Sequence, residues 1–252
     1  MKLPTAKIDW FFPREITSLH QIEITSRCNL RCVYCPSPNL KRPKVDMNRS
    51  TFERALEWAA FYVNKGSQSE LNLAGIGEST IHPDFIQYLE LARSAMGWGV
   101  KIIFATNGLE IARRPELAQE MAPFKPAVWV SLHRPEKGGM AVQHLQAQGI
   151  LEGVSIDPSL NANEWAGQVK WKTDNPGGMA CQWLRGGKIM AMADGRLTTC
   201  CLDASGIGVI GDVKDEIGSV ETRPYDLCKT CHQTIGVAHW DQVRGKWEDE
   251  LE

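Results

Sequence analysis

Short apolar segments alternate with longer segments of helical periodicity along most of this chain, from residue 22 to about residue 172. Several apolar segments are apolar on both faces, which is typical of buried parallel strands. We predict strands over residues 21–25, 70–74, 100–106, 127–132, 153–156 and 168–172. Strands that alternate with helices form βαβ units, and a complete eightfold barrel of such units needs about 250 residues. Six units in about 150 residues therefore predict an α/β fold, a partial (β/α)6 TIM-like barrel.

The helices between these strands have recognisable ends. Ser50 and Glu53 are spaced as a capping box at the start of a helix that ends at Lys65-Gly66. Proline begins two further helices, near residue 83 and near residue 115.

The pattern changes after the Pro-Gly-Gly sequence of residues 176–178. Segments 188–193 and 196–201 flank Asp194-Gly195, a strong signal for a two-residue hairpin, and residues 238–251 predict a terminal helix. We therefore expect a lead-in over residues 1–20, a barrel over 21–176 and a small extension over 177–252.

Charge and hydropathy narrow the choice of partners. The formal net charge is −2, so a nucleic-acid partner is possible but is not indicated by the charge of the whole molecule. No segment approaches the roughly 18 consecutive apolar residues of a membrane helix, and charged residues interrupt the first twelve positions. We expect no membrane partner and a soluble, cytoplasmic protein.

A first group of cysteines, Cys28, Cys32 and Cys35, follows the first predicted strand directly. In a reducing compartment such spacing indicates metal ligation before disulfides. Three thiolates do not complete a structural zinc site, but they can hold three irons of a four-iron cluster and leave the fourth iron open. The alternatives are inert thiols or a zinc site with a distant fourth ligand.

This C-x3-C-x2-C spacing, with an aromatic residue before the last cysteine, resembles the radical S-adenosylmethionine (SAM) superfamily. The resemblance implies that the three cysteines bind a 4Fe-4S cluster whose open iron is chelated by SAM. Reductive cleavage of SAM then yields a 5′-deoxyadenosyl radical. Tyr34 is expected to pack near the adenine.

Three later motifs strengthen the resemblance and come in the family order over about 110 residues. Ile76-Gly77-Glu78-Ser79 resembles the family's Gly-Gly-Glu-Pro, although it departs from that motif at the first and last positions. There the strand end and Glu78 are expected to bind the SAM ammonium. The remaining expected SAM contacts follow the third and fourth predicted strands: Thr106, Asn107 and Ser131.

The second cysteine group comprises Cys181, Cys200, Cys228 and Cys231. Four thiolates suit either an all-cysteine zinc site or a fully ligated 4Fe-4S cluster. The spacing around Gly195 resembles Twitch, the shortened form of the SPASM auxiliary-cluster extension, which favours a second, auxiliary cluster. Adjacent Cys201 is surplus or replaces Cys200, because neighbouring residues of a strand point to opposite faces.

Radical chemistry requires a substrate in the barrel mouth. Three polar residues past strand ends, His133, Arg134 and Asp157, are the candidate catalytic residues, although each has a structural alternative. The basic segment 41–49 is interpreted as a solvated face that a phosphate or carboxylate could also use. Trp165 and Trp171 are most simply packing residues, with base or sugar stacking as the alternative.

In size and layout the chain resembles Twitch-bearing oxidoreductases, the 2-deoxy-scyllo-inosamine dehydrogenases. This resemblance implies oxidation of a small molecule, with an electron passed to the auxiliary cluster and a flavodoxin- or ferredoxin-type donor. The alternatives are peptide modification, or a redox-neutral isomerase reaction on an amino acid carried by a nucleotide or nucleic acid. A zinc-stabilised binding module on the same scaffold is the non-enzymatic alternative.

Overall fold

The computed structural model describes residues 15–157, 165–170 and 181–231. Its strands form one eight-stranded sheet in the order β5-β4-β3-β2-β1-β6-β7-β8. The strand bounds are β1 Ser18–Ile22, β2 Glu70–Asn72, β3 Lys101–Thr106, β4 Ala127–Ser131, β5 Leu151–Ser155, β6 Lys188–Ala191, β7 Arg196–Thr198 and β8 Val209–Asp212. The helices are α1 Arg49–Asn64, α2 Phe85–Met96, α3 Leu109–Arg113, α4 Glu116–Met121, α5 Pro135–Ala147 and α6 Gln182–Arg185.

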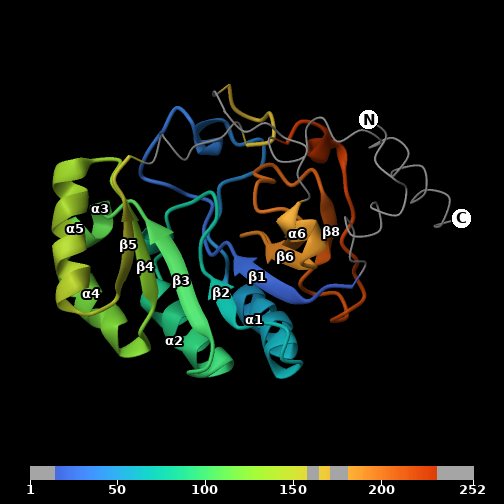
Figure 1. The fold of residues 1–252 in the computed structure, drawn as a ribbon, viewed down its shortest axis with the longest axis horizontal. Coiled ribbons are helices and arrows are strands. Elements are labelled where there is room, and N and C mark those ends of the chain that lie inside the picture. The colour runs from blue at the N-terminus through green and yellow to red at the C-terminus, as the bar shows by residue number, and fades with distance from the viewer. Residues whose placement is uncertain (1–14, 158–164, 171–180, 232–252) are drawn as a thin grey trace, which may run out of the picture.

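Strands β5 to β1, together with β6, run parallel, which confirms the α/β fold with its mainly parallel sheet. Helices α1, α2 and α5 cover one face of this sheet (Figure 1). Along β4, the side chains of Val128 and Val130 are fully buried, whereas Trp129 between them is 45% exposed. Because successive strand residues point to opposite faces, the helix-covered face of β4 belongs to the core and its other face is partly accessible.

The sixth parallel strand is not the one predicted. Residues 168–170 form a turn, and residues 171–172 lie outside the described residues. The sixth strand is instead β6, which pairs in parallel with β1 through Ser18↔Lys188 and Leu19↔Ile189. The predicted hairpin is confirmed, since β6 also pairs with antiparallel β7, but the pairing of Ala191 with Leu197 centres its loop on Asp194, so the predicted two-residue turn is wrong. One segment therefore serves both as a barrel strand and as the first arm of the hairpin.

Helix α1 shows how local sequence defines these elements. Its N-cap is Asn48, whose side-chain oxygen accepts a hydrogen bond from Thr51 N at 2.9 Å, so the capping box predicted at Ser50 is wrong. The helix ends as predicted at Lys65, followed by Gly66 with φ 73°. Its inner face, which includes Phe52 and Trp58, is fully buried in the core.

The domain boundary near residue 176, the lead-in up to residue 14 and the helix over 238–251 lie outside the described residues, so these stay predictions. Within the described ranges, no helix is both long and apolar enough to cross a membrane.

Candidate active site

The loop with the first three cysteines is closed at its base by the segment that returns to α1. Ser26 and Val45 exchange backbone and side-chain hydrogen bonds, with Ser26 N to Val45 O at 3.0 Å and Val45 N to Ser26 Oγ at 2.8 Å. Thr25 Oγ1 donates to Asp46 Oδ1 at 2.6 Å, and Arg27 forms an ion pair with the same carboxylate at 3.1 Å. The loop therefore leaves the end of β1 from a fixed base.

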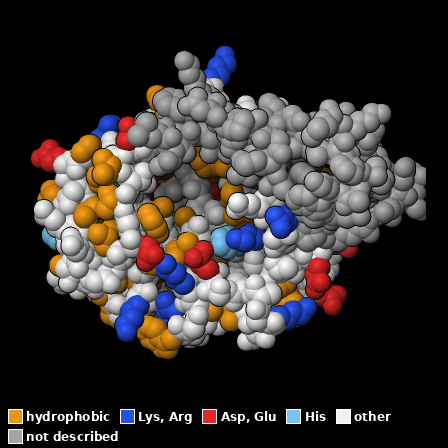
Figure 2. All heavy atoms as spheres, viewed as in Figure 1, with side chains coloured by type: hydrophobic (Ala, Val, Ile, Leu, Met, Phe, Trp, Pro, Cys, Tyr) orange, Lys and Arg blue, Asp and Glu red, His pale blue; other side chains and the backbone are white. Residues whose placement is uncertain are grey.

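The expected SAM site forms one cavity at the carboxyl ends of the parallel strands. The cavity encloses about 930 Å³ of space that opens to solvent, and a hollow with hydrophobic walls is visible on this face of the molecule (Figure 2). Its lining includes every residue predicted to bind the first cluster or SAM, together with one catalytic candidate: Cys28, Cys32, Tyr34, Cys35, Ile76, Gly77, Glu78, Thr106, Asn107, Ser131 and His133. Trp165 also lines it. Trp171 lies outside the described residues.

A close backbone approach holds the second motif against the cysteine loop. A Cβ added to Gly77 would lie 2.1 Å from Thr25 O and 2.5 Å from Arg27 O. Glu78 N donates to Arg27 O at 2.8 Å. No larger residue fits at Gly77 without moving one segment, so glycine is required here by space rather than by φ.

Glu78 is only 4% exposed, and its carboxylate joins the second motif to the third. Its carboxylate accepts hydrogen bonds from Thr80 Oγ1 at 2.6 Å, Thr106 Oγ1 at 2.7 Å and Asn107 N at 2.7 Å. Burial raises the pKa of Glu78, and these hydrogen bonds oppose that shift. Asn107 Nδ2 also donates to Asn29 Oδ1 at 2.8 Å, which ties the third motif to the cysteine loop.

His133 stands between the cysteine loop and β4. Its Nδ1 lies 2.5 Å from Tyr34 Oη and 3.6 Å from Cys32 Sγ, and the two rings stack with centroids 5.9 Å apart. Burial and the charge of Arg134 lower the pKa of His133, which favours the neutral imidazole. Arg134 and Asp157 are exposed and do not line the cavity among the described residues, although Asp157 acts electrostatically on Tyr34.

The thiols of this cavity fit a cluster. Leu30 N donates to Cys28 Sγ at 3.4 Å and Ser37 N donates to Cys35 Sγ at 3.5 Å, which are contacts suited to metal-bound thiolates. Burial raises the pKa of Cys28 and raises that of Cys35 to about 11. These thiols therefore keep their protons at neutral pH until a metal displaces them.

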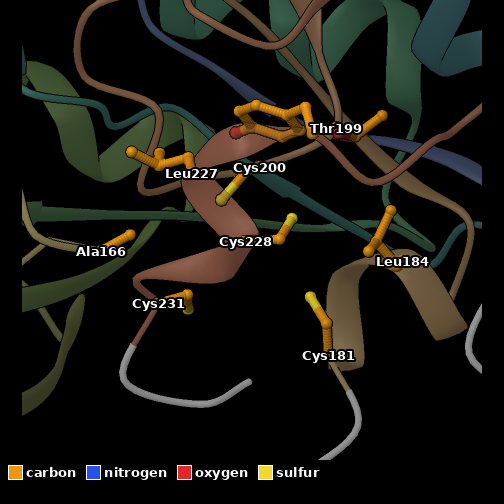
Figure 3. Close-up of a pocket in the computed structure, with 9 residues that line it drawn as sticks. Ala166, Cys181, Leu184, Thr199, Cys200, Leu227, Cys228 and Cys231 are labelled. Carbon is orange, nitrogen blue, oxygen red and sulfur yellow. The ribbon is translucent and has the colours of Figure 1, made fainter. Parts of the chain in front are cut away.

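The second cysteine group lines a separate cavity, which holds about 320 Å³ of space that is partly open to solvent (Figure 3). Cys181 comes from the start of α6 and Cys200 from the loop after β7. Cys228 lies in a late 3-10 turn, Asp226–Lys229, and Cys231 lies two residues after that turn. All four line this cavity, and the surplus Cys201 does not. The other lining residues are mainly apolar: Ala166, Leu184, Thr199, Tyr225 and Leu227.

The ligand set of this cavity bears on which metal group would fit. A zinc ion holds four thiolates at about 2.3 Å, and a fully ligated four-iron cluster also takes four thiolates. The four cysteines around this cavity supply a full set of ligands for either group.

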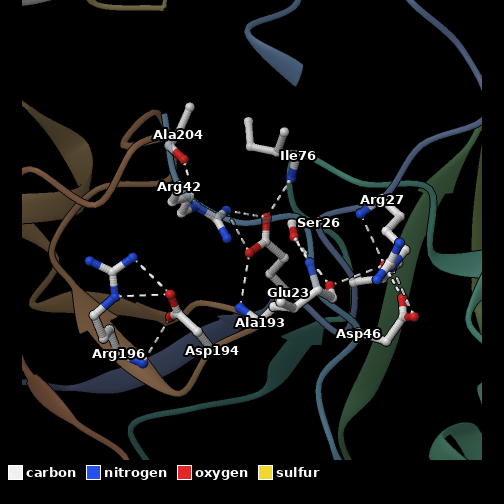
Figure 4. A network of polar contacts seen from close by, with 12 residues as sticks. Glu23, Ser26, Arg27, Arg42, Asp46, Ile76, Ala193, Asp194, Arg196 and Ala204 are labelled. Atoms are coloured by element: carbon white, nitrogen blue, oxygen red, sulfur yellow. Dashed lines mark hydrogen bonds and ion pairs between the residues drawn. The ribbon is translucent and has the colours of Figure 1, made fainter. Parts of the chain in front are cut away.

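A buried ion pair that sequence reasoning missed ties the SAM cavity to the segments that follow β6 and β7 (Figure 4). Glu23, just past β1, accepts two hydrogen bonds from Arg42 Nη2 at 2.8 and 2.7 Å. The same carboxylate accepts from Ile76 N at 3.0 Å and Ala193 N at 2.9 Å. Arg42 Nε donates to Ala204 O at 2.7 Å, close to the second cysteine group.

The interpretation of the basic segment as a solvated face is therefore wrong for Arg42, which is 6% exposed. Lys41, Lys44 and Arg49 are exposed as predicted. The run of basic residues does not indicate that Arg42 is buried. Arg42 differs from its neighbours only in its contact with the carboxylate of Glu23, which directly follows β1.

Comparison with known proteins identifies the class of protein that this fold and site define. Residues 22–169, more than half of the chain, match the model of the radical SAM superfamily, and the chain belongs to that superfamily. It is therefore a radical SAM enzyme, and membership implies a 4Fe-4S cluster and SAM.

Curated relatives match the chain over part of their own length. Mycofactocin maturase MftC of Mycobacterium tuberculosis is 35% identical over 104 residues, which are 40% of this chain and 23% of MftC. GTP 3′,8-cyclase of Rhizobium etli is 26% identical over 145 residues, which are 57% of this chain and 40% of the cyclase. The chain thus spans about a quarter to two fifths of these relatives' length.

Solved structures share the fold over most of the chain. The crystal structure of BtrN in complex with AdoMet and 2-DOIA has a TM-score of 0.66 and 15% identity, and the match covers 81% of each chain. Native anSMEcpe with bound AdoMet and Cp18Cys peptide has a TM-score of 0.52 and 16% identity, with 79% of this chain and 78% of that chain covered. At such identities the similarity concerns the fold alone.

Proposed function

We propose that this radical SAM enzyme oxidises a small molecule and passes the resulting electron to a second 4Fe-4S cluster held by Cys181, Cys200, Cys228 and Cys231. The observation that carries the proposal is the separate apolar cavity lined by these four cysteines. With four protein ligands, no iron of that cluster is open to substrate, so electron transfer is the role that fits it.

The first cavity has the groups needed to bind SAM and orient it. Cys28, Cys32 and Cys35 would hold the SAM-binding cluster, which supplies one electron to cleave SAM into methionine and a 5′-deoxyadenosyl radical. Ile76 and Gly77 line the cavity in the loop after β2 and offer backbone carbonyls to the amino acid part of SAM. The contacts expected for the nucleoside are Tyr34, Thr106, Asn107 and Ser131.

Glu78 has a different role in this proposal from that expected from its sequence motif. Its carboxylate already accepts hydrogen bonds from Thr80, Thr106 and Asn107. We infer that it chiefly fixes the strand ends of β2 and β3 relative to each other, and that backbone atoms beside it meet the SAM ammonium.

His133 is the proposed proton acceptor for the substrate. It lines the SAM cavity, and a neutral imidazole has one ring nitrogen that can accept a proton. The substrate loses one hydrogen atom to the deoxyadenosyl radical, then one proton to His133 and one electron to the second cluster. This electron balances the one spent on SAM cleavage, so no external oxidant is required. Arg134, which follows His133 in the chain, and Asp157 remain candidates for substrate contacts.

Iron content and SAM cleavage test this proposal. Wild-type protein reconstituted with iron and sulfide without oxygen should bind about eight irons per chain, because each four-iron cluster adds four. Incubation with SAM and dithionite should release 5′-deoxyadenosine. Cys32→Ala should abolish that release, whereas Cys228→Ala should lose four irons and retain it.

The neighbouring cysteines supply a matched control. Cys200→Ala should lose the second cluster and Cys201→Ala should keep it, since only Cys200 lines the cavity. A wild-type chain that binds four irons, or binds zinc in place of the second cluster, would refute the proposed electron acceptor. A product with the same mass as the substrate would indicate the redox-neutral rearrangement instead.

The electron for SAM cleavage is expected to come from a flavodoxin- or ferredoxin-type donor. Such donors and oxygen-sensitive clusters fit a cytoplasmic location, which we propose with the function. Fractionation of the native host and reduction assays with purified donor proteins test these two points.

A further inference from the structure

A buried tyrosine hydroxyl stands at the wall of the four-cysteine cavity. The Tyr225 side chain lines that cavity, and its hydroxyl oxygen is buried with no hydrogen-bond partner among the described residues. The hydroxyl lies beside Cys200 and interacts electrostatically with its thiol, yet its geometry falls short of a formal hydrogen bond. A buried donor without a partner is costly and rare in folded proteins.

Packing fixes the position of this tyrosine. A Cβ added to Gly208 would lie 2.3 to 2.5 Å from ring atoms at the hydroxyl end of Tyr225, so the ring rests directly on the glycine backbone. Asp203, fully buried, accepts from Gly208 N at 2.7 Å and holds that backbone in place. At its other end, Tyr225 O accepts from Cys228 N at 2.9 Å. Gly208 therefore supports the ring on one side, and the backbone of Tyr225 is hydrogen-bonded to the loop that carries Cys228.

The chemistry of sulfur explains why such a donor would be retained. A protonated thiol is a weak acceptor, whereas a thiolate bound to iron is a good one. Leu202 N donates to Cys200 Sγ at 3.3 Å, so this sulfur already accepts one hydrogen bond.

We propose that Tyr225 donates a hydrogen bond to the cluster-bound sulfur of Cys200 and thereby raises the reduction potential of the second cluster. This inference rests on the proposed function, because it needs a cluster in that cavity. A hydrogen bond to a cluster sulfur stabilises the reduced form, which carries one more negative charge, more than the oxidised form. Tyr225 would thus be a positioning and tuning residue that makes the second cluster a better electron acceptor.

The test measures the midpoint potential of the second cluster in the Cys28→Ala/Cys32→Ala/Cys35→Ala background, where it is the sole cluster expected. Tyr225→Phe should keep four irons per chain and weaken reduction about tenfold, a negative shift of about 59 mV for one electron. Thr199→Val is the matched control, because Thr199 lines the same cavity but its hydroxyl donates to Arg223 O at 3.3 Å. It should leave the potential unchanged.

A second variant keeps the test decisive if the Tyr225→Phe protein misfolds. Replacing Tyr225 by 3-fluorotyrosine strengthens the donor while keeping the ring, so the potential should move in the positive direction. Equal potentials in the parent, Tyr225→Phe and 3-fluorotyrosine proteins, each with four irons, would overturn the inference and leave the proposed function intact. A parent protein without iron would overturn both.

Discussion

Removing Arg42 should destabilise the fold far more than removing an exposed arginine. The Glu23 side chain is 0% exposed and that of Arg42 is 3% exposed. Arg42→Met would leave a buried carboxylate with two backbone N–H donors and no counter-charge. Breaking a buried pair in this way costs about 3–5 kcal/mol of unfolding free energy. The exposed Arg49–Glu53 pair, at 2.8 Å, provides the control, and Arg49→Met should cost at most about 0.5 kcal/mol.

The pairwise nature of this effect can be measured with a double-mutant cycle in urea on protein prepared without iron, which avoids coupling to cluster loss. Glu23→Gln alone leaves the guanidinium buried and should also cost about 3–5 kcal/mol. The double variant Glu23→Gln/Arg42→Met contains no buried charge, so its cost should be well below the sum. Additive costs, or an Arg42→Met cost equal to that of Arg49→Met, would refute the reasoning.

Three further predictions concern other sites. Gly77→Ala should sharply weaken SAM binding in equilibrium dialysis because its Cβ would lie 2.1 Å from Thr25 O, whereas Gly99→Ala, with open space around it, should bind SAM normally. Gly139→Ala in the middle of α5 meets nothing within 4 Å and should raise the unfolding free energy by about 0.5–1 kcal/mol in urea; a loss would contradict the described helix. Burial lowers the pKa of His20 to about 4 in the folded protein, whereas a histidine in the unfolded chain titrates near 6.5. As the pH falls from about 6.5 to 4, the unfolded chain therefore binds a proton that the folded protein does not. Stability should therefore fall over that window, by about 1–2 kcal/mol after solvent screening, and the decline should be shallower in His20→Gln; an unchanged slope would argue against a neutral His20.

The sequence was sufficient to predict the elements that local pattern defines. Apolar runs followed by polar motifs located β1 to β5 to within a few residues, and the motif residues share one cavity because parallel strands end at the same edge. The N-cap at Asn48 was missed because Ser50 and Glu53 offer a plausible competing pattern two residues later. Local sequence patterns of this kind do not distinguish well between N-cap candidates that lie two residues apart.

Features that depend on distant parts of the chain were not predictable. The parallel pairing of Lys188 with Ser18 joins segments that no local periodicity relates. Arg42 lies in a charged stretch typical of a surface, and its burial depends on Glu23 and Ala204. The unpartnered hydroxyl of Tyr225 likewise becomes visible only when the loops with Gly208 and Cys200 meet.

The central place of β1 in the sheet constrains the order of events when the ribosome makes this chain. One neighbour, β2, emerges about fifty residues later, but the other, β6, is synthesised only after some 170 residues have followed β1. Until then one side of β1 is an open edge, vulnerable to pairing with a wrong strand. Ala193, whose N–H donates to the Glu23 carboxylate as that of Ile76 does, belongs to the same late segment. Iron should therefore be inserted near the end of biogenesis, when both sets of thiols first have a finished scaffold.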